Sequence, residues 1–153
     1  MKASSASSKR AAVPVAAVST QPPSRPYTGL RFAVSIQDMQ RTGAVEVVLP
    51  AARIVALPRR TRAVQFEPLV IRRGLTDSTE WFDWWEQARR PRPRPRLVAV
   101  ALLEASGTEA VRWLFRDCVP VGYALSPLNA LVASTVIESL ELGVGDFQLY
   151  RRQ

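Results

Sequence analysis

The residues that could take part in catalysis are few and are dispersed along the sequence. The 153 residues include no histidine, which removes the commonest general base and metal ligand and every Ser–His or Cys–His nucleophile pair. The single cysteine, Cys118, has no imidazole to activate it and cannot form an internal disulfide. We expect it to be a small buried thiol. No catalytic residue, cofactor or metal ligand is assigned.

Two pairs of carboxylates are close enough in sequence to raise the question of acid–base catalysis. Asp83 and Glu86 fall on the polar side of a predicted helix. Glu138 and Glu141 fall in a predicted strand, where residues three apart point to opposite faces. Neither pair is expected to bring two carboxylates to one reacting atom, so an enzyme is the least favoured hypothesis.

The net charge of +8 is concentrated in two segments. Residues 1–26 carry four basic residues and no acidic one, and residues 89–96 carry five basic residues and no acidic one. The remainder holds 12 basic against 13 acidic residues, so the folded body is expected to be nearly neutral. This distribution weakens the case for a basic face that binds nucleic acid. A nucleic-acid-binding module that uses these two segments is nevertheless retained as the alternative function.

Composition divides the chain into two parts. Residues 1–26 are predicted to be a flexible Pro/Ala/Ser-rich N-terminal arm, because they cannot bury enough apolar surface to offset their ordering entropy. The apolar run 11–18 is short, begins late and contains Pro14, so it is a poor match to a secretory signal. No apolar run approaches the roughly 20 residues that span a bilayer, and no membrane insertion is expected. Residues 27–153 are predicted to form one β domain.

Alternation of apolar and polar residues predicts that this domain is mainly β, an antiparallel barrel or sandwich with one α-helix. In the first strand, Leu30, Phe32, Val34 and Ile36 share one face. A turn that contains Gly107 joins two strands into a hairpin. Strands are predicted at residues 27–36, 44–49, 53–57, 63–71, 97–103, 110–116, 119–125 and 135–142, and the C-terminal QLYRRQ is predicted to extend the last one.

The helix is predicted from its cap and from its tryptophans. Asp77 is a preferred N-cap, and Glu80 three places later completes the spacing of a capping box. The residues between the tryptophans are acidic, whereas base-stacking platforms interleave aromatic and basic residues. We therefore expect the aromatic stripe to pack in the core. The predicted core positions are Trp81, Trp84 and Trp85 on the helix, with Trp113 and Phe115 on one face of the strand 110–116.

The segment 89–96 follows the helix and alternates arginine with proline. This pattern favours an extended, polyproline-like connector that carries solvated charge. A ligand for an SH3-type domain and a phosphate-binding arm are weaker alternatives. An adaptor function through this segment would predict a folded monomer in solution.

The order of these motifs resembles the tail-tube protein family of contractile phages and phage-derived injection particles. The likeness covers roughly residues 66–147, with an echo in residues 27–36. The matching stretches are Arg72–Thr76 and Glu80–Trp84 around the helix start, Arg112–Leu114 in the hairpin, Pro120, the loop Ser126–Ala130, and the closing strand Val136–Leu142.

The resemblance implies a non-enzymatic structural subunit that is assembled in the bacterial cytoplasm. Six copies would form a ring by joining strands into one continuous barrel, and rings would stack into a tube inside a contractile sheath. The implied partners are the chain itself, neighbouring rings, the baseplate hub or spike, and the sheath. The candidate subunit contacts are the N-terminal arm and Arg89, Arg90, Arg92, Arg94 and Arg96.

One region departs from the family pattern. Between Ile36 and Phe66 the chain is shorter and differently built, and in the family this region helps one ring to stack on the next. A second hypothesis is therefore a divergent initiator ring that joins the tube to the baseplate spike.

Overall fold

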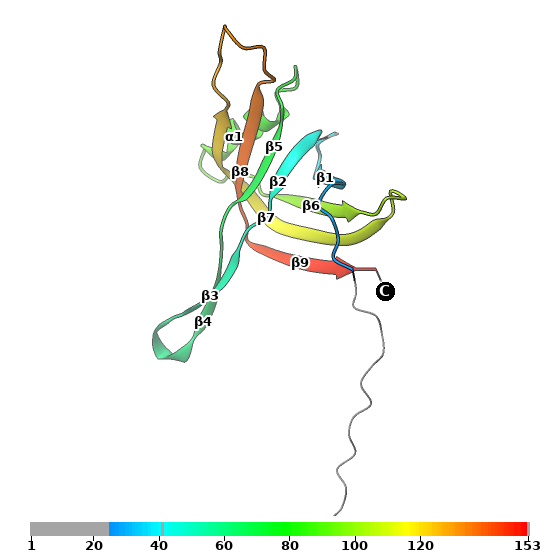
Figure 1. Cartoon of the computed structure of the whole chain (residues 1–153). Helices are drawn as coiled ribbons and strands as arrows, with labels where there is room; N and C mark the ends of the chain where they lie inside the picture. The colour runs from blue at the N-terminus through cyan, green and yellow to red at the C-terminus, as the bar shows by residue number, and fades with distance from the viewer. Residues whose placement is uncertain (1–24, 41, 153) are drawn as a thin grey trace, which may run out of the picture.

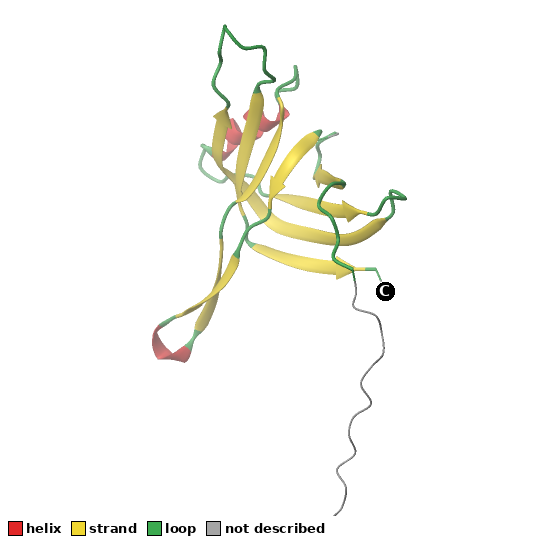
Figure 2. Ribbon diagram, in the orientation of Figure 1, coloured by secondary structure: helices red, strands yellow, loops and turns green. Residues whose placement is uncertain are grey.

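The computed structural model describes residues 25–40 and 42–152, so the predicted arm lies outside the described residues except for Arg25 and Pro26. The described residues form an antiparallel β structure with one α-helix (Figures 1 and 2). In chain order the elements are β1 (Phe32–Ile36), β2 (Ala44–Val48), β3 (Ala52–Ala56), β4 (Arg62–Phe66), β5 (Leu69–Gly74), α1 (Glu80–Ala88), β6 (Arg96–Leu103), β7 (Glu109–Leu125), β8 (Ile137–Gly143) and β9 (Asp146–Arg151).

Strand β7 is 17 residues long and belongs to two sheets. Its first part pairs with β6 and β9, which gives a four-stranded sheet in the order β1-β6-β7-β9. Its second part pairs with β8, and the second sheet continues through β5 to β2. Through the shared strand, the paired strands run in the order β1-β6-β7-β8-β5-β2. The two end strands, β1 and β2, do not pair with each other, so the barrel of a single subunit stays open.

The C-terminal segment extends the last strand, as the sequence predicts, after a short interruption. Gly143 of β8 pairs with Val119, and Asp146 of β9 pairs with Arg116, so both strands follow β7 in one register. The N–H of Gly145 donates to the carbonyl of Arg116 at 3.0 Å. A Cβ at Gly145 would lie 2.9 Å from the Cβ of Asp117, so this close approach requires glycine.

The core lies between the two sheets and beneath α1, which packs against β7. Aliphatic side chains from β1, β5, β6 and β8 meet the helix tryptophans there. No helix among the described residues is long and apolar enough to cross a membrane. The buried cluster consists of Ile36, Leu69, Ile71, Trp81, Trp84, Val98, Val100, Phe115, Cys118, Leu140 and Leu142.

Three strand predictions were wrong in their extent. The first strand begins at Phe32, and Leu30 precedes it as an exposed residue rather than sharing its buried face. The strand predicted for 63–71 is two strands, because Pro68 lies in the break between β4 and β5. The strands predicted for 110–116 and 119–125 are one, since β7 passes through Asp117 with a φ of 52° and continues.

Strands β3 and β4 form a separate hairpin that projects from the body (Figure 1). Its tip is the 3-10 turn Pro58–Arg60, in which Arg59 and Arg60 have φ values of 64° and 60°. Two successive positive φ values are typical of hairpin turns that favour Asn and Gly. In this hairpin, two arginines adopt that conformation and lie at the tip.

Candidate subunit interfaces

The two buried tryptophans of α1 each lie beneath an arginine from a strand. Trp81 and Trp84 are 0% and 2% exposed, so these two members of the predicted aromatic stripe lie in the core. The guanidinium of Arg73 lies 4.2 Å from the Trp81 ring centroid, and that of Arg96 lies 5.4 Å from the Trp84 ring. Both contacts are within the range of cation–π attraction, so the arginines help to fix the helix on the sheets.

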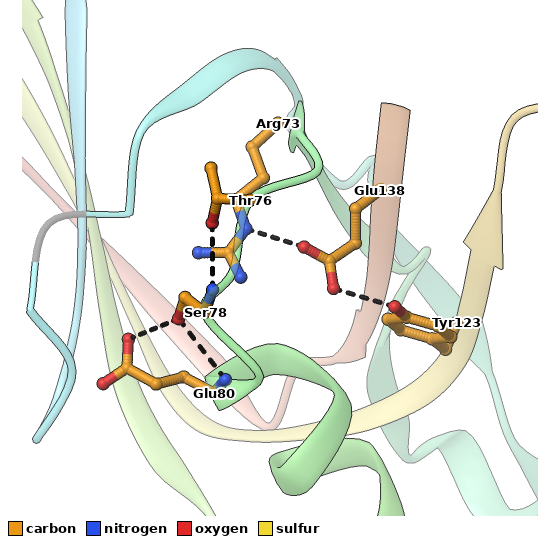
Figure 3. Close-up of polar contacts among 6 residues, drawn as sticks. All are labelled: Arg73, Thr76, Ser78, Glu80, Tyr123 and Glu138. Atoms are coloured by element: carbon orange, nitrogen blue, oxygen red, sulfur yellow. Dashed lines mark hydrogen bonds and ion pairs between the residues drawn. The ribbon is translucent and has the colours of Figure 1, made fainter. Parts of the chain in front are cut away.

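Arg73 also belongs to a buried polar network with Glu138 and Tyr123, drawn in Figure 3. The Nε of Arg73 donates to Glu138 Oε2 at 2.7 Å, and the Tyr123 hydroxyl donates to Glu138 Oε1 at 2.8 Å. Burial, the hydrogen bond to Glu138 and its negative charge raise the pKa of Tyr123 to about 12. The network thus joins β5, β7 and β8 under the helix.

Sequence reasoning missed this network, although it placed Glu138 and Glu141 on opposite faces of their strand. Glu138 shares that face with Leu140 and Leu142, and all three are buried, while Glu141 on the other face is exposed. The prediction that Glu138 and Glu141 do not act as a pair is consistent with this arrangement. A carboxylate on an apolar face was the available signal, since buried charges need a partner.

The start of α1 differs from the prediction. The helix begins at Glu80 with Thr79 as the N-cap residue, so Asp77 as N-cap was wrong. Figure 3 shows the alternative: the Ser78 N–H donates to the Thr76 hydroxyl at 3.2 Å, and the Glu80 N–H donates to the Ser78 hydroxyl at 3.5 Å. The N-cap Thr79 makes no side-chain hydrogen bond to the helix backbone, and the hydroxyl groups of Thr76 and Ser78 instead accept from N–H groups in the turn that leads into the helix and at its first residue.

The Arg-Pro segment is a folded connector, not the extended one that was predicted. Arg92 has a φ of 63°, which departs from polyproline geometry and reverses the chain between α1 and β6. The Arg94 N–H donates to Gln87 Oε1 at 3.0 Å, and its carbonyl accepts from Trp84 Nε1 at 3.1 Å. These bonds hold the segment against the helix.

The arginines of this segment divide into two groups. Arg96 donates through Nη1 to the carbonyl of Gln37 at 2.8 Å, Arg94 lies 3.7 Å from Asp38, and Arg89 lies 2.6 Å from Glu86. Within the described part of the chain, the Arg90 and Arg92 side chains are exposed and have no ion-pair partner. Arg96 also makes no ion pair with a described residue, but it is partly buried over Trp84, so Arg90 and Arg92 are the better placed of the five predicted contacts to meet a neighbour.

The other predicted core residues are buried to different degrees. Phe115 is 1% exposed, while Trp85 and Trp113 are partly buried, and Trp113 packs against the core cluster. Cys118 is buried, as expected, and burial followed by the charge of Asp117 raises the pKa of its thiol to about 12. Such a thiol is a poor nucleophile.

The four-stranded sheet has two strands, β1 and β9, with only one neighbour each among the described residues. The Arg152 N–H donates to the carbonyl of Ala110. Along an antiparallel ladder, every second residue bonds to the paired strand and the residues between them point their backbone N–H and C=O groups the other way. Phe147 and Leu149 therefore point these groups away from β7. On β1 the Gln37 N–H donates to the carbonyl of Leu97, so by the same alternation the backbone groups of Phe32 and Val34 point away from β6. The Thr42 hydroxyl donates to the free Val34 carbonyl at 2.6 Å, which covers part of that edge.

Apolar side chains are exposed at two projecting ends of the molecule. Ile54 and Val64 face each other across the β3–β4 hairpin and are 68% and 57% exposed. The loop between β7 and β8 carries Leu128 and Leu131, and Figure 1 shows it at the opposite end from the hairpin. No group of three or more potential metal ligands occurs among residues 25–40 and 42–152. Exposed apolar surfaces of this kind are suited to association with another protein.

The described residues thus form an open antiparallel barrel with one helix, two unpaired edge strands and projecting apolar elements. The chain belongs to the family described as T4-like virus tail tube protein gp19, whose sequence profile matches residues 29–148. The family resemblance found in the sequence is thereby confirmed. No curated protein matches the sequence.

Solved structures share the fold at low sequence identity. A chain of the anti-feeding prophage baseplate has 18% identity and a TM-score of 0.65 over 84% of this chain and 97% of that one. A chain of the anti-feeding prophage tube-terminating cap has 11% identity and a TM-score of 0.68 over 89% and 99%. Hcp1 from Flavobacterium johnsoniae has 11% identity and a TM-score of 0.58 over 77% and 93%. This chain thus shares its overall fold with these three chains.

Proposed function

We propose that this chain is a structural subunit of the inner tube of a contractile injection particle, and that six copies form a ring. The observation that carries this proposal is the four-stranded sheet with free edges at β1 and β9. Exposed edges of this kind tend to pair with another strand. If β9 of one copy pairs with β1 of the next, the same contact repeats around the ring and leaves no edge open.

Contacts between rings would use the two projecting ends. The β3–β4 hairpin and the β7–β8 loop lie at opposite ends of the subunit and both expose apolar side chains. A chain that presents complementary surfaces at opposite ends can stack in one direction. Neighbouring rings are therefore the proposed partners of these ends, and the sheath and the baseplate hub or spike are the proposed partners of the assembled tube.

Electron microscopy in negative stain combined with light scattering tests the oligomer directly. Six-fold rings are the expected result. Stacked tubes would assign the chain to the repeating tube, and rings that do not stack would assign it to a divergent end ring such as an initiator. A strict monomer that binds DNA at moderate salt would contradict the proposal and support the nucleic-acid alternative, whose binding should weaken steeply as salt rises.

The role of the β9 edge is tested by Leu149→Pro. The Leu149 N–H faces away from β7, so proline removes an edge donor and leaves the ladder with β7 in place. We expect Leu149→Pro to prevent ring formation while the monomer keeps its circular dichroism spectrum. Leu149→Ala is the matched control, because it truncates the same side chain and retains the N–H. Rings that form normally from Leu149→Pro would rule out pairing through β9.

A further inference from the structure

An apolar groove opens between the two sheets beside Trp113. It consists of two adjoining hollows of about 430 and 650 Å³, which share Tyr27, Leu102 and Trp113. The first hollow extends to Val45 and Glu46 on β2, and the second extends to the C-terminal end of β9. We call this surface the Trp113 groove.

The groove leaves apolar side chains uncovered. Tyr27 and Val45 on its walls are 61% and 62% exposed, and Trp113 is only partly buried although it contacts the core. Each hollow has the volume of an ordinary ligand site, which is roughly 300–1,000 Å³. The charged residues of the lining lie at its two ends, Glu46 in the first hollow and Arg25, Arg151 and Arg152 in the second, and the lining between them is largely apolar. An apolar stretch of polypeptide fits this chemistry.

The chain itself supplies such a stretch at the rim of the groove. Arg25 and Pro26 line the second hollow, and residues 1–24 precede them. These residues include AAVPVAAV at positions 11–18, separated from Arg25 by six residues. Six residues can span up to about 20 Å, which is enough for the chain to turn back along its own groove.

Charge favours one direction for the segment in the groove. Arg25, Arg151 and Arg152 line the end where the chain enters, and Glu46 lines the far end. A segment that turns back from Arg25 places Val18 near the basic end and Lys9 and Arg10 near Glu46. The opposite direction would bring Lys9 and Arg10 against three arginines, a like-charge arrangement that is unfavourable.

We propose that residues 11–18 dock in the Trp113 groove of their own chain. The docked segment covers Tyr27, Val45 and Trp113. This inference does not rest on the proposed tube function, because it requires only one copy of the chain.

Amide hydrogen exchange of the full-length chain tests the proposal. We expect the amides of residues 11–18 to exchange about tenfold more slowly, or slower still, in the native chain than in Val45→Asp. Val45 lines the groove and is exposed, so the substitution alters the groove without altering the arm or the core. Val48→Asp is the matched control, because Val48 is an exposed residue of the same strand that does not line the groove. It should retain the slow exchange.

The arm side is tested by Val13→Asp combined with Val15→Asp. This variant should shift the indole NMR signal of Trp113, whereas Ala3→Asp combined with Ala6→Asp adds the same charge outside the apolar run and should leave the signal unchanged. Unprotected amides at 11–18 in the native chain, or equal effects of Val45→Asp and Val48→Asp, would overturn the proposal.

Co-expression separates the chain's own arm from that of a neighbour. The Val45→Asp chain has an intact arm, and the Val13→Asp/Val15→Asp chain has an intact groove. If the segment docks in its own chain, a mixture of the two should show no slow exchange at 11–18. Slow exchange that returns in the mixture would overturn the proposal in favour of a neighbouring copy's arm as the occupant.

Discussion

Arg73 and Glu138 occupy opposed positions on β5 and β8, and their side chains meet at an Nε–Oε2 distance of 2.7 Å. Both side chains are buried, at 5% and 1% exposure. The same guanidinium lies over the Trp81 ring, and the same carboxylate accepts from Tyr123. One ion pair therefore fixes the relative positions of β5, β7, β8 and α1.

Removing one member of this pair should destabilise the subunit strongly. Glu138→Leu and Arg73→Met should each cost about 3–5 kcal/mol in the free energy of unfolding, because each leaves a buried charge without its partner. The double variant should cost less than the sum of the two, since it removes both charges. Urea denaturation of the native chain, the two single variants and the double variant gives the coupling free energy between Arg73 and Glu138. Additive losses would show that the two charges do not interact.

Stability at high pH should depend on Tyr123. Its pKa is raised from 10.0 to about 12 in the folded state. As the pH rises, the unfolded state therefore loses the hydroxyl proton of Tyr123 before the folded state does. The associated stability is complete below pH 10 and is lost as the pH rises towards 12. The difference in unfolding free energy between the native chain and Tyr123→Phe should therefore shrink over this range. A difference that stays constant from pH 9 to 11.5 would contradict the raised pKa.

Truncation of the buried tryptophan of α1 should test the core role of the helix. Trp84→Ala should cost about 3–5 kcal/mol, because it removes a large side chain from a packed interior. Phe82→Ala is the control on the same helix, since Phe82 is 43% exposed and its ring meets the ring of Tyr123 edge to face. Thermal unfolding measures both. Equal losses, or an unchanged melting temperature for Trp84→Ala, would show that the helix does not anchor the fold.

The face of the β3–β4 hairpin that carries Ile54 should be required for stacking between rings. Ile54→Asp should reduce stacking and leave single rings, because a charge would replace an apolar contact. Gln65→Asp adds the same charge on the opposite face of the hairpin and serves as the control. Tube length in electron micrographs is the measurement. Tubes of normal length from Ile54→Asp would assign the hairpin another role.

The sequence predicts those parts of the fold that depend on local periodicity. The stripe Trp81 and Trp84 follows from helical spacing, and the hairpin of β6 and β7 follows from alternation around Gly107. The opposite orientation of Glu138 and Glu141 on β8 is also predicted, and the structure buries the first and exposes the second. These features are set by residues a few positions apart, for which the burial of one face decides the structure.

Other features depend on partners far away in the sequence. Nothing near Arg73 indicates that Glu138 lies opposite it, because the register between β5 and β8 is set by the whole sheet. The reversal at Arg92 follows from the need to connect α1 to β6, and it overrides the extended preference of alternating prolines. The helix start is ambiguous for a different reason, since Asp77 competes with adjacent hydroxyl side chains as a capping residue.

The shared strand β7 has a mechanical consequence. A force applied at the β9 edge is transmitted to β7 through the hydrogen bonds between these two strands. It then reaches the second sheet along the covalent backbone of β7, because the same strand pairs with β8. No sliding interface between the sheets has to carry that force. Two sheets that share one strand would therefore move together under load rather than slide past each other.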